Sequence, residues 1–269
     1  MNFAFEWLKQ WLKRPIFIGA CLLYPFLLWI QLNEDLQTLH SASVFYYYNL
    51  SSQLGLTTSV LATLAGLPII SIFHELIESG MDRYLLVRRS FTKLSIKIIS
   101  LVVFISSLVT LFGSCLFILT LQLAGNPIFN HGNALAPYYQ IWIDQEKWLA
   151  SLIIMILSTI LTHCFYILLG FTFTSYFKRK SFSYLGPWIV SIGLKLLIPI
   201  TNKTLIFHPT YVFSHISSGL DPNQRVTNPL GPLAYMTLYL MIMLMIAVLS
   251  LIYRFYSLKG GSYVLYKRH

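Results

Sequence analysis

Residues Ile98–Ala124, IISLVVFISSLVTLFGSCLFILTLQLA, decide the fold, because this stretch of 27 residues carries no charged side chain. A helix needs about 20 mostly apolar residues to cross the roughly 30 Å of hydrocarbon in a membrane, and a buried helix of a soluble protein needs fewer. The stretch therefore predicts a transmembrane helix.

The composition of the whole chain agrees with this prediction. Of its 269 residues, 56% are hydrophobic and only 10% are charged, whereas about a quarter of the residues in soluble domains are charged. Disorder and an ordinary soluble domain are excluded. The net charge of +10 would suggest nucleic acid as the partner of a soluble protein, but here the basic residues lie between apolar runs, so the expected partner is membrane lipid.

Five further apolar runs lie on either side of Ile98–Ala124. We predict an all-α, polytopic integral membrane protein with six transmembrane helices, forming a single transmembrane domain over residues 1–269. The predicted spans are residues 15–32, 56–73, 98–124, 148–177, 184–201 and 230–253. The fifth span is short and contains Lys195 and two prolines.

The distribution of basic residues predicts the orientation. Fifteen of the nineteen Lys and Arg residues lie before the first span, after the sixth, between spans two and three, or between spans four and five. Because basic residues are retained on the cytoplasmic side, both termini are predicted to be cytoplasmic, in a multi-pass protein of the cell (plasma) membrane. This asymmetry supports an even number of spans, because the loss of one span would move a basic segment to the other side. The fifth and sixth spans are therefore predicted together.

The N-terminus and the exterior loops offer few other signals. Residues 1–14 are amphipathic and predict an interfacial helix, although an ordinary basic tail is an alternative. The first span is longer than the apolar region of a signal peptide, so we expect it to be retained. The exterior loops, residues 33–55, 125–147 and 202–229, are too short for an extracellular domain. Their aromatic residues, such as Tyr46–Tyr48, are typical of an interfacial belt, with a substrate-facing role as the alternative.

Catalytic and cofactor motifs are missing from the sequence. His74-Glu75 opens a pattern like the zinc-binding HExxH, but the fifth position is Glu78 instead of histidine. Neither a phosphate-binding GxxxxGK[ST] loop nor a GxSxG nucleophile motif occurs. The three cysteines lie within apolar runs, where cysteine behaves as a small hydrophobic residue. We therefore predict no catalytic residue, no metal site and no cofactor in this chain.

Two polar residues within the predicted spans are candidates for a substrate path. His163 lies deep in the fourth span, where either packing or function can explain it. Lys195 lies close enough to the outer boundary for its ammonium to reach the headgroups, and a role in an ion path is the alternative. Gly66-Leu67-Pro68 and Gly186-Pro187 are flexing points or tolerated kinks.

The charged segment after the second span resembles that of a known family. Six spans, cytoplasmic termini, an amphipathic N-terminus and this segment are similar to the permease subunit of type-two ABC exporters, including small bacteriocin export and immunity permeases. The positions that match the family pattern are Glu75, Glu78, Gly80, Leu85, Leu86, Arg88, Ser90 and Lys97. The chain departs from the pattern at Met81, where threonine is common, and at Arg88-Arg89, where a proline-containing turn is usual.

The resemblance implies that residues 75–92 form a cytoplasmic coupling helix that docks on a separate ATPase subunit. The residues implied in this contact are Glu75, Glu78, Gly80, Asp82, Arg83, Arg88 and Arg89. Two permease copies and two ATPases would form the exporter. ATP would be bound and hydrolysed by the partner, and the cargo would be an apolar or amphipathic peptide or lipid. Two alternatives from other classes remain: a stand-alone membrane immunity or scaffold protein without transport activity, and an intramembrane enzyme.

Overall fold

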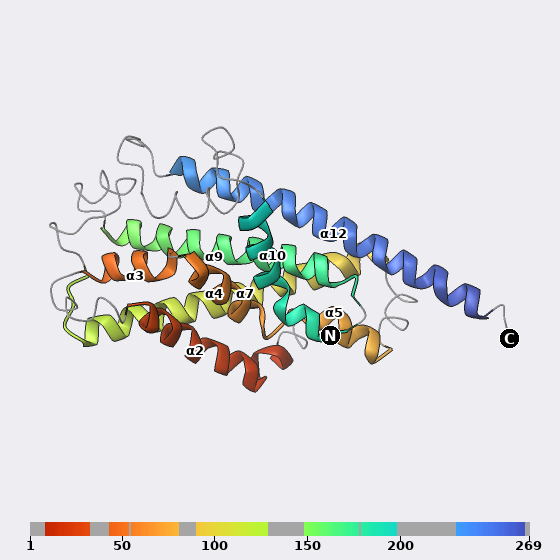
Figure 1. Cartoon of the computed structure of the whole chain (residues 1–269), viewed down its shortest axis with the longest axis horizontal. Helices are drawn as coiled ribbons and strands as arrows, with labels where there is room; N and C mark the ends of the chain where they lie inside the picture. Colours follow the sequence, from red (N-terminus) through yellow and green to blue (C-terminus); the bar gives the residue numbers. More distant parts are fainter. Residues whose placement is uncertain are drawn as a thin grey trace.

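The computed structural model of the chain describes residues 9–32, 43–53, 55–80, 90–128, 148–177, 179–197 and 230–266. Every regular element among these residues is a helix, as expected for an all-α protein. In chain order the helices are α2 (Pro15–Gln31), α3 (Val44–Gln53), α4 (Gly55–Gly66), α5 (Ile72–Glu78), α7 (Phe91–Leu123), α9 (Trp148–Thr174), α10 (Ser181–Leu197) and α12 (Leu230–Tyr266). Most of them lie along one long axis (Figure 1).

Three helices of the described part are long and apolar enough to cross a membrane: α7, α9, and α12 over Thr237–Ser257. Helix α2 is apolar but has only 17 residues. The described residues thus support a helical membrane protein with three such helices instead of six. Helix α7 begins at Phe91, before the predicted start of its span, and α12 continues beyond the predicted end of the sixth.

The second predicted span, residues 56–73, is not one helix. Helix α4 ends at Gly66, and a turn over residues 67–71 separates it from α5. Pro68 explains the break, because proline has no amide hydrogen to donate and disfavours helical geometry at the residue before it. The amides of Ile69 and Ile70 instead bond the Gly66 carbonyl, at 3.0 and 2.9 Å.

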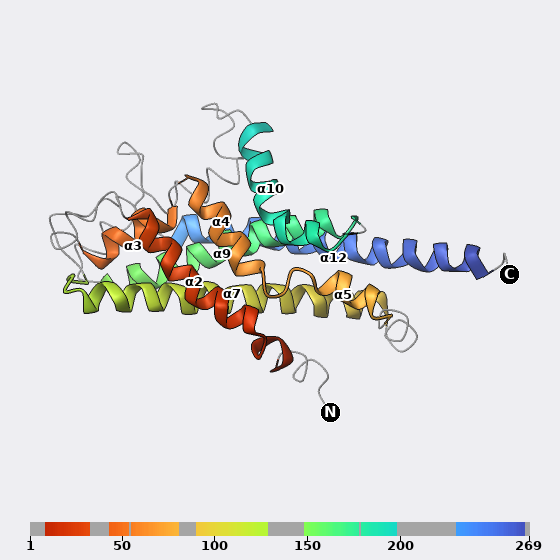
Figure 2. The ribbon, with the colours of Figure 1, turned by 60° about the horizontal axis from the view of Figure 1, so that its bottom comes forward.

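Part of the predicted exterior loop 33–55 is helix α3. Tyr47 and Tyr48 on this helix are fully buried, so the prediction that they belong to an interfacial belt is wrong. The Tyr48 hydroxyl lies 2.8 Å from Ser114 Oγ on α7. The aromatic pattern did not reveal this burial, because an interfacial tyrosine and a core tyrosine look alike in sequence. Together α3, α4 and α5 follow the long axis as a broken helix (Figures 1 and 2).

Helix α10, which contains most of the fifth predicted span, runs across the long axis in both views (Figures 1 and 2). Its backbone touches α9 where glycines face each other: a Cβ added to Gly170 would lie 2.6 Å from the Gly186 carbonyl carbon, and it would also overlap the Pro187 nitrogen. Small residues allow helix backbones to approach closely. This crossing therefore depends on the lack of side chains at Gly170 and Gly186.

Contacts between distant segments define two ends of the bundle. At one end Val44 N donates to Pro127 O at 2.9 Å, which joins α3 to the residues after α7. At the other end, α5 lies near the start of α2, the turn between α9 and α10, and the part of α12 around Phe255. Arg14, Lys180 and Arg254, from three of the four basic segments, make their contacts at this second end. The orientation of these segments relative to a membrane stays a prediction.

The buried core runs between α2, α7, α9 and α12. Helix α7 turns a face of Ile98, Val102, Ile105 and Val109 inward, at the three- and four-residue spacing of one helix face. Gly113 on the same face leaves room for the Tyr24 ring, since an added Cβ would lie 2.5 Å from Tyr24 Cδ1. Close contact between α2 and α7 follows from this glycine.

Candidate functional site

The predicted coupling segment is described over residues 75–80 and 90–92. It is not a single helix: α5 ends at Glu78, Gly80 has a left-handed φ of 66°, and α7 begins at Phe91. Glycine suits this position because a side chain would be strained there. Asp82, Arg83, Arg88, Arg89, Leu85 and Leu86 lie outside the described residues. Ser90 caps the N-terminus of α7, where its side chain accepts from Lys93 N.

Glu75 anchors α5 to the beginning of α2. Its carboxylate accepts two hydrogen bonds from Arg14, with Nη1 to Oε1 at 3.2 Å and Nη2 to Oε2 at 2.9 Å. The Ser71 hydroxyl donates a third to Oε1 at 2.6 Å. Burial alone would raise the pKa of Glu75, but the hydrogen bonds from Arg14 and Ser71 and the charges of Arg14 and Lys180 together lower it. Glu75 therefore stays ionised as a fixed anchor.

Arg14 is itself held in place by an aromatic ring. Its guanidinium carbon lies 3.4 Å from the ring centroid of Trp11, which is only 5% exposed. A cation over an indole face is attracted by the ring quadrupole. Of the predicted interfacial helix the structure describes residues 9–14, and residues 9–12 are helical. Trp11 packs against Arg14, while the position of this segment relative to a membrane stays a prediction.

His74 joins α5 to the other side, the turn between α9 and α10. Its Nε2 lies 2.8 Å from the Phe177 carbonyl oxygen, and its Nδ1 lies 3.0 Å from Ser183 Oγ. A carbonyl only accepts, so Nε2 donates to the Phe177 oxygen, whereas the Ser183 hydroxyl can either donate to Nδ1 or accept from it. Both ring nitrogens of the buried imidazole are therefore hydrogen-bonded. His74 is thus a structural bridge between α5 and the segment that joins α9 to α10.

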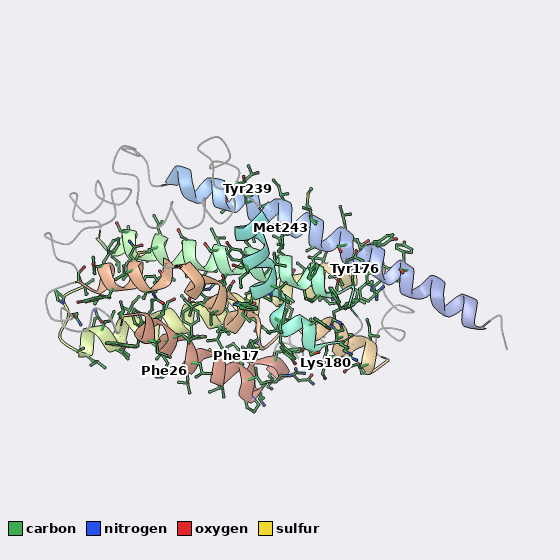
Figure 3. The ribbon with its side chains drawn as sticks, viewed as in Figure 1. Phe17, Phe26, Tyr176, Lys180, Tyr239 and Met243 are labelled. Carbon is green, nitrogen blue, oxygen red and sulfur yellow. The ribbon has the colours of Figure 1, made fainter. Side chains whose placement is uncertain are left out.

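Glu78 reaches the same turn at the surface. Its Oε2 lies 3.3 Å from Lys180 Nζ, with the two side chains 54% and 46% exposed. Figure 3 shows Lys180 beside α5, and Tyr176 against α12, where its hydroxyl lies 2.8 Å from Ser250 Oγ. An ion pair this exposed contributes little stability. Glu78 is thus the acidic residue of α5 that is most open to another protein.

Aromatic rings complete the attachment of α5. Phe73 packs against Phe255 of α12, with ring centroids 5.6 Å apart, and Phe91 packs against the same ring at 6.2 Å. We call this set of contacts the α5 junction, formed by residues 71–78 together with Arg14, Phe177, Lys180, Ser183 and Phe255. It ties one short helix to α2, to the turn between α9 and α10, and to α12.

The second candidate, His163, lies in a buried polar cluster inside the bundle. Its Nδ1 is 3.1 Å from Thr110 Oγ1 and 3.5 Å from the Tyr24 hydroxyl. The Thr110 hydroxyl donates to the Ser106 carbonyl at 3.1 Å, which leaves its oxygen to accept from Nδ1–H. His163 Nε2 has no hydrogen-bond partner among the described residues. The cluster links α2, α7 and α9.

We expect Thr110→Val to lower the free energy of unfolding in detergent by about 1 kcal/mol, the usual size of a side-chain hydrogen bond between membrane helices. The loss should largely disappear in a His163→Leu background, because the partner is then already absent. Thr162→Val is the control, since the Thr162 hydroxyl bonds only the Ser158 carbonyl of its own helix. Equal effects of both valines would show that His163 contributes no interhelical bond.

Other predicted site features are only partly placed. Lys195 belongs to α10, but its side chain lies outside what the structure describes. Gly66-Leu67-Pro68 is the break between α4 and the following turn, and Gly186-Pro187 is the crossing with α9. Within the described ranges no three His, Cys, Asp or Glu residues gather as a metal site would require.

Sequence reasoning missed the partners that hold α5. Arg14 and Lys180 were interpreted only as topology signals, although each flanks a predicted span on the same side as Glu75 and Glu78, which is a weak pairing signal. The Phe177 carbonyl and Ser183 carry no signal in the sequence. Comparison with protein-family models, with curated proteins and with solved structures finds no match.

Proposed function

We propose that this chain is the membrane-spanning permease subunit of an ATP-driven exporter, and that α5 receives force from a separate ATPase subunit. The α5 junction is the observation that carries the proposal. Each contact of α5 leads to a different part of the bundle: Arg14 to α2, His74 to the turn between α9 and α10, and Phe255 to α12. A push on this helix would reach all of them together.

The junction also suggests how two conformational states would be biased. A partner shifts an equilibrium only through different contacts with the two states. Glu78 and the residues that follow Gly80 would form the docking surface, while Glu75 and His74 would transmit movement inward. This divides the acidic residues of the predicted coupling segment into one that docks and one that anchors.

The finer topology is part of the same proposal. Helix α2 would provide the first crossing, and α3 and α4 together the second, with α5 on the cytoplasmic side. Helix α9 ends and α12 begins at opposite ends of the bundle (Figure 1), which supports a fifth crossing between them as part of the proposal. Six crossings place both termini in the cytoplasm of a cell whose plasma membrane holds the protein. As in the family it resembles, two copies would enclose the route of an apolar or amphipathic peptide or lipid.

Purification of the tagged full chain from source-cell membranes in mild detergent tests this function. An ATPase subunit with a phosphate-binding loop should be recovered with the wild type. Its yield should fall about tenfold, equivalent to about 1.4 kcal/mol of binding, for a Glu78→Arg, Arg83→Glu double variant. Glu146→Gln, in a predicted exterior loop, is the control and should leave the yield unchanged.

Two results would overturn the proposal. One is full biological activity in cells that lack every such ATPase, which supports the stand-alone immunity or scaffold protein. The other is an equal ATPase yield from the double variant and the wild type, which removes α5 as the docking element.

A further inference from the structure

Two lysines near the start of α7 lie on one exposed face. Lys93 and Lys97 are both exposed and are one helical turn apart, which brings residues of a helix within about 5 to 6 Å of each other at Cβ. Neither side chain has a hydrogen bond or ion pair with the described residues. The opposite face, which includes Leu94 and Ile98, is buried.

The acidic residues that could neutralise these lysines are already paired. Glu75 and Glu78 are the acidic residues within the described ranges. The first binds Arg14 and the second binds Lys180. The exposed positive charge at this end of the bundle therefore lacks a partner within the described part of the chain.

The position of the lysines in α7 adds to this imbalance. The N-terminus of a helix carries partial positive charge, so acidic residues stabilise it and basic residues do not. The first turn of α7 has no acidic residue, and Lys93 lies in it. An anion bound beside the lysines would reduce the repulsion between their two ammonium groups. It would also reduce the repulsion between these groups and the positive end of the helix dipole.

Toward the C-terminal end of α7, large apolar side chains take the place of the lysines on the same face. Exposed Ser100, Phe104 and Leu111 follow Lys93 and Lys97 at three-, four- and seven-residue steps, which keep them in one line along the helix. At 1.5 Å per residue, Phe104 lies about 10 Å beyond Lys97 and Leu111 about 21 Å. The hydrocarbon of one leaflet is about 15 Å thick, half of the 30 Å core. Phe104 is thus at the depth of the acyl chains of a lipid whose headgroup contacts the lysines, and Leu111 lies beyond that leaflet.

We propose that this face of α7 binds an anionic phospholipid, with the phosphate between Lys93 and Lys97 and an acyl chain along Phe104. Charge complementarity selects the occupant: a zwitterionic phospholipid such as phosphatidylcholine would bring a choline cation close to the two ammonium groups and offset the attraction of its phosphate, and a soluble phosphate would leave the apolar line uncovered. The positive-inside rule requires only that the charge lies on one side, whereas this site requires two free lysines in register with an apolar line. The proposal does not depend on an ATPase partner.

Native mass spectrometry of the purified full chain tests the site, with phosphatidylglycerol and phosphatidylcholine of identical acyl chains as probes. Each lysine near a membrane surface strengthens the binding of anionic lipid. The wild type should bind phosphatidylglycerol about thirtyfold more tightly than phosphatidylcholine, equivalent to about 2 kcal/mol for two lysines, and Lys93→Gln, Lys97→Gln should abolish the difference. Lys93→Arg, Lys97→Arg should keep it, which also shows that the positions tolerate change.

Lys9→Gln, Lys13→Gln is the matched control, because it removes two exposed lysines from the same end of the bundle. It should leave the lipid preference intact. An equal loss in both double variants would overturn the site in favour of general surface charge. Equal binding of the two lipids by the wild type, or full competition by glycerol 3-phosphate without acyl chains, would also overturn it.

Discussion

Gly170→Ala is expected to lower the free energy of unfolding by about 3 kcal/mol, the upper part of the range for overpacked sites. The new Cβ would lie 2.6 Å from the Gly186 carbonyl carbon and overlap the Pro187 nitrogen. Those are backbone atoms, which cannot rotate away as a flexible side chain can. The crossing of α9 and α10 must therefore open.

Thermal or denaturant unfolding in detergent measures the loss, and Gly193→Ala is the matched control. Gly193 lies on α10 with no heavy atom within 4 Å of its added Cβ, so alanine there should be neutral or should stabilise by up to about 1 kcal/mol through helix propensity. A local readout is the disulfide formed after Ser59→Cys and Ser191→Cys, because these hydroxyls are hydrogen-bonded between α4 and α10. Gly170→Ala should slow this cross-link. Equal stability of the two alanine variants would contradict the crossing.

Arg14→Gln is expected to lower the free energy of unfolding by about 2 kcal/mol, in the range for hydrogen bonds to charged groups. It leaves the Glu75 carboxylate, 27% exposed, without its two-point partner. Combining it with Glu75→Gln should recover about 1 kcal/mol in a double-mutant cycle, since the unpaired charge is then gone. The same cycle on Glu78 and Lys180, which are about half exposed, should give less than about 0.5 kcal/mol. Equal coupling in the two cycles would contradict the role of Glu75 as the anchor.

The Glu75 contribution should also depend on pH. Folding lowers the pKa of this carboxyl below its ordinary value of 4.5, so the unfolded chain takes up the proton first as the pH falls. The stabilisation is complete above about pH 4.5 and is lost as the pH falls through the lower pKa of the folded state. Between pH 7 and pH 3 the melting temperature should fall further for the wild type than for Glu75→Gln. Parallel curves would show that Glu75 titrates alike in both states.

Helix positions were the most predictable feature of the fold. Spans 98–124 and 148–177 correspond closely to α7 and α9, because a long uncharged run has few alternatives to a continuous helix. The broken second span was less predictable. Residues 56–73 carry no charged side chain, and their hydropathy does not reveal that Pro68 interrupts the backbone hydrogen bonds.

The location of the candidate site was predictable, but the partners of its residues were not. Sequence pointed to the charged residues after the second span, and α5 lies there. The partners of Glu75 and Glu78 are 61 and 102 residues away, and a pattern along the chain carries no distance between such residues. His163 was recognised as an unusual polar residue, while its bond to Thr110 depends on the packing of α7 against α9.

By itself, the sequence determined that this is a helical membrane protein, because the cost of placing charge in hydrocarbon acts on composition alone. Only the tertiary structure decided that α10 crosses the bundle and that α5 contacts α2, the turn between α9 and α10, and α12. Those outcomes depend on whether two backbones can touch at Gly170 and Gly186, and on whether Arg14 reaches Glu75. Such contacts are set by shape and distance between residues far apart in the chain.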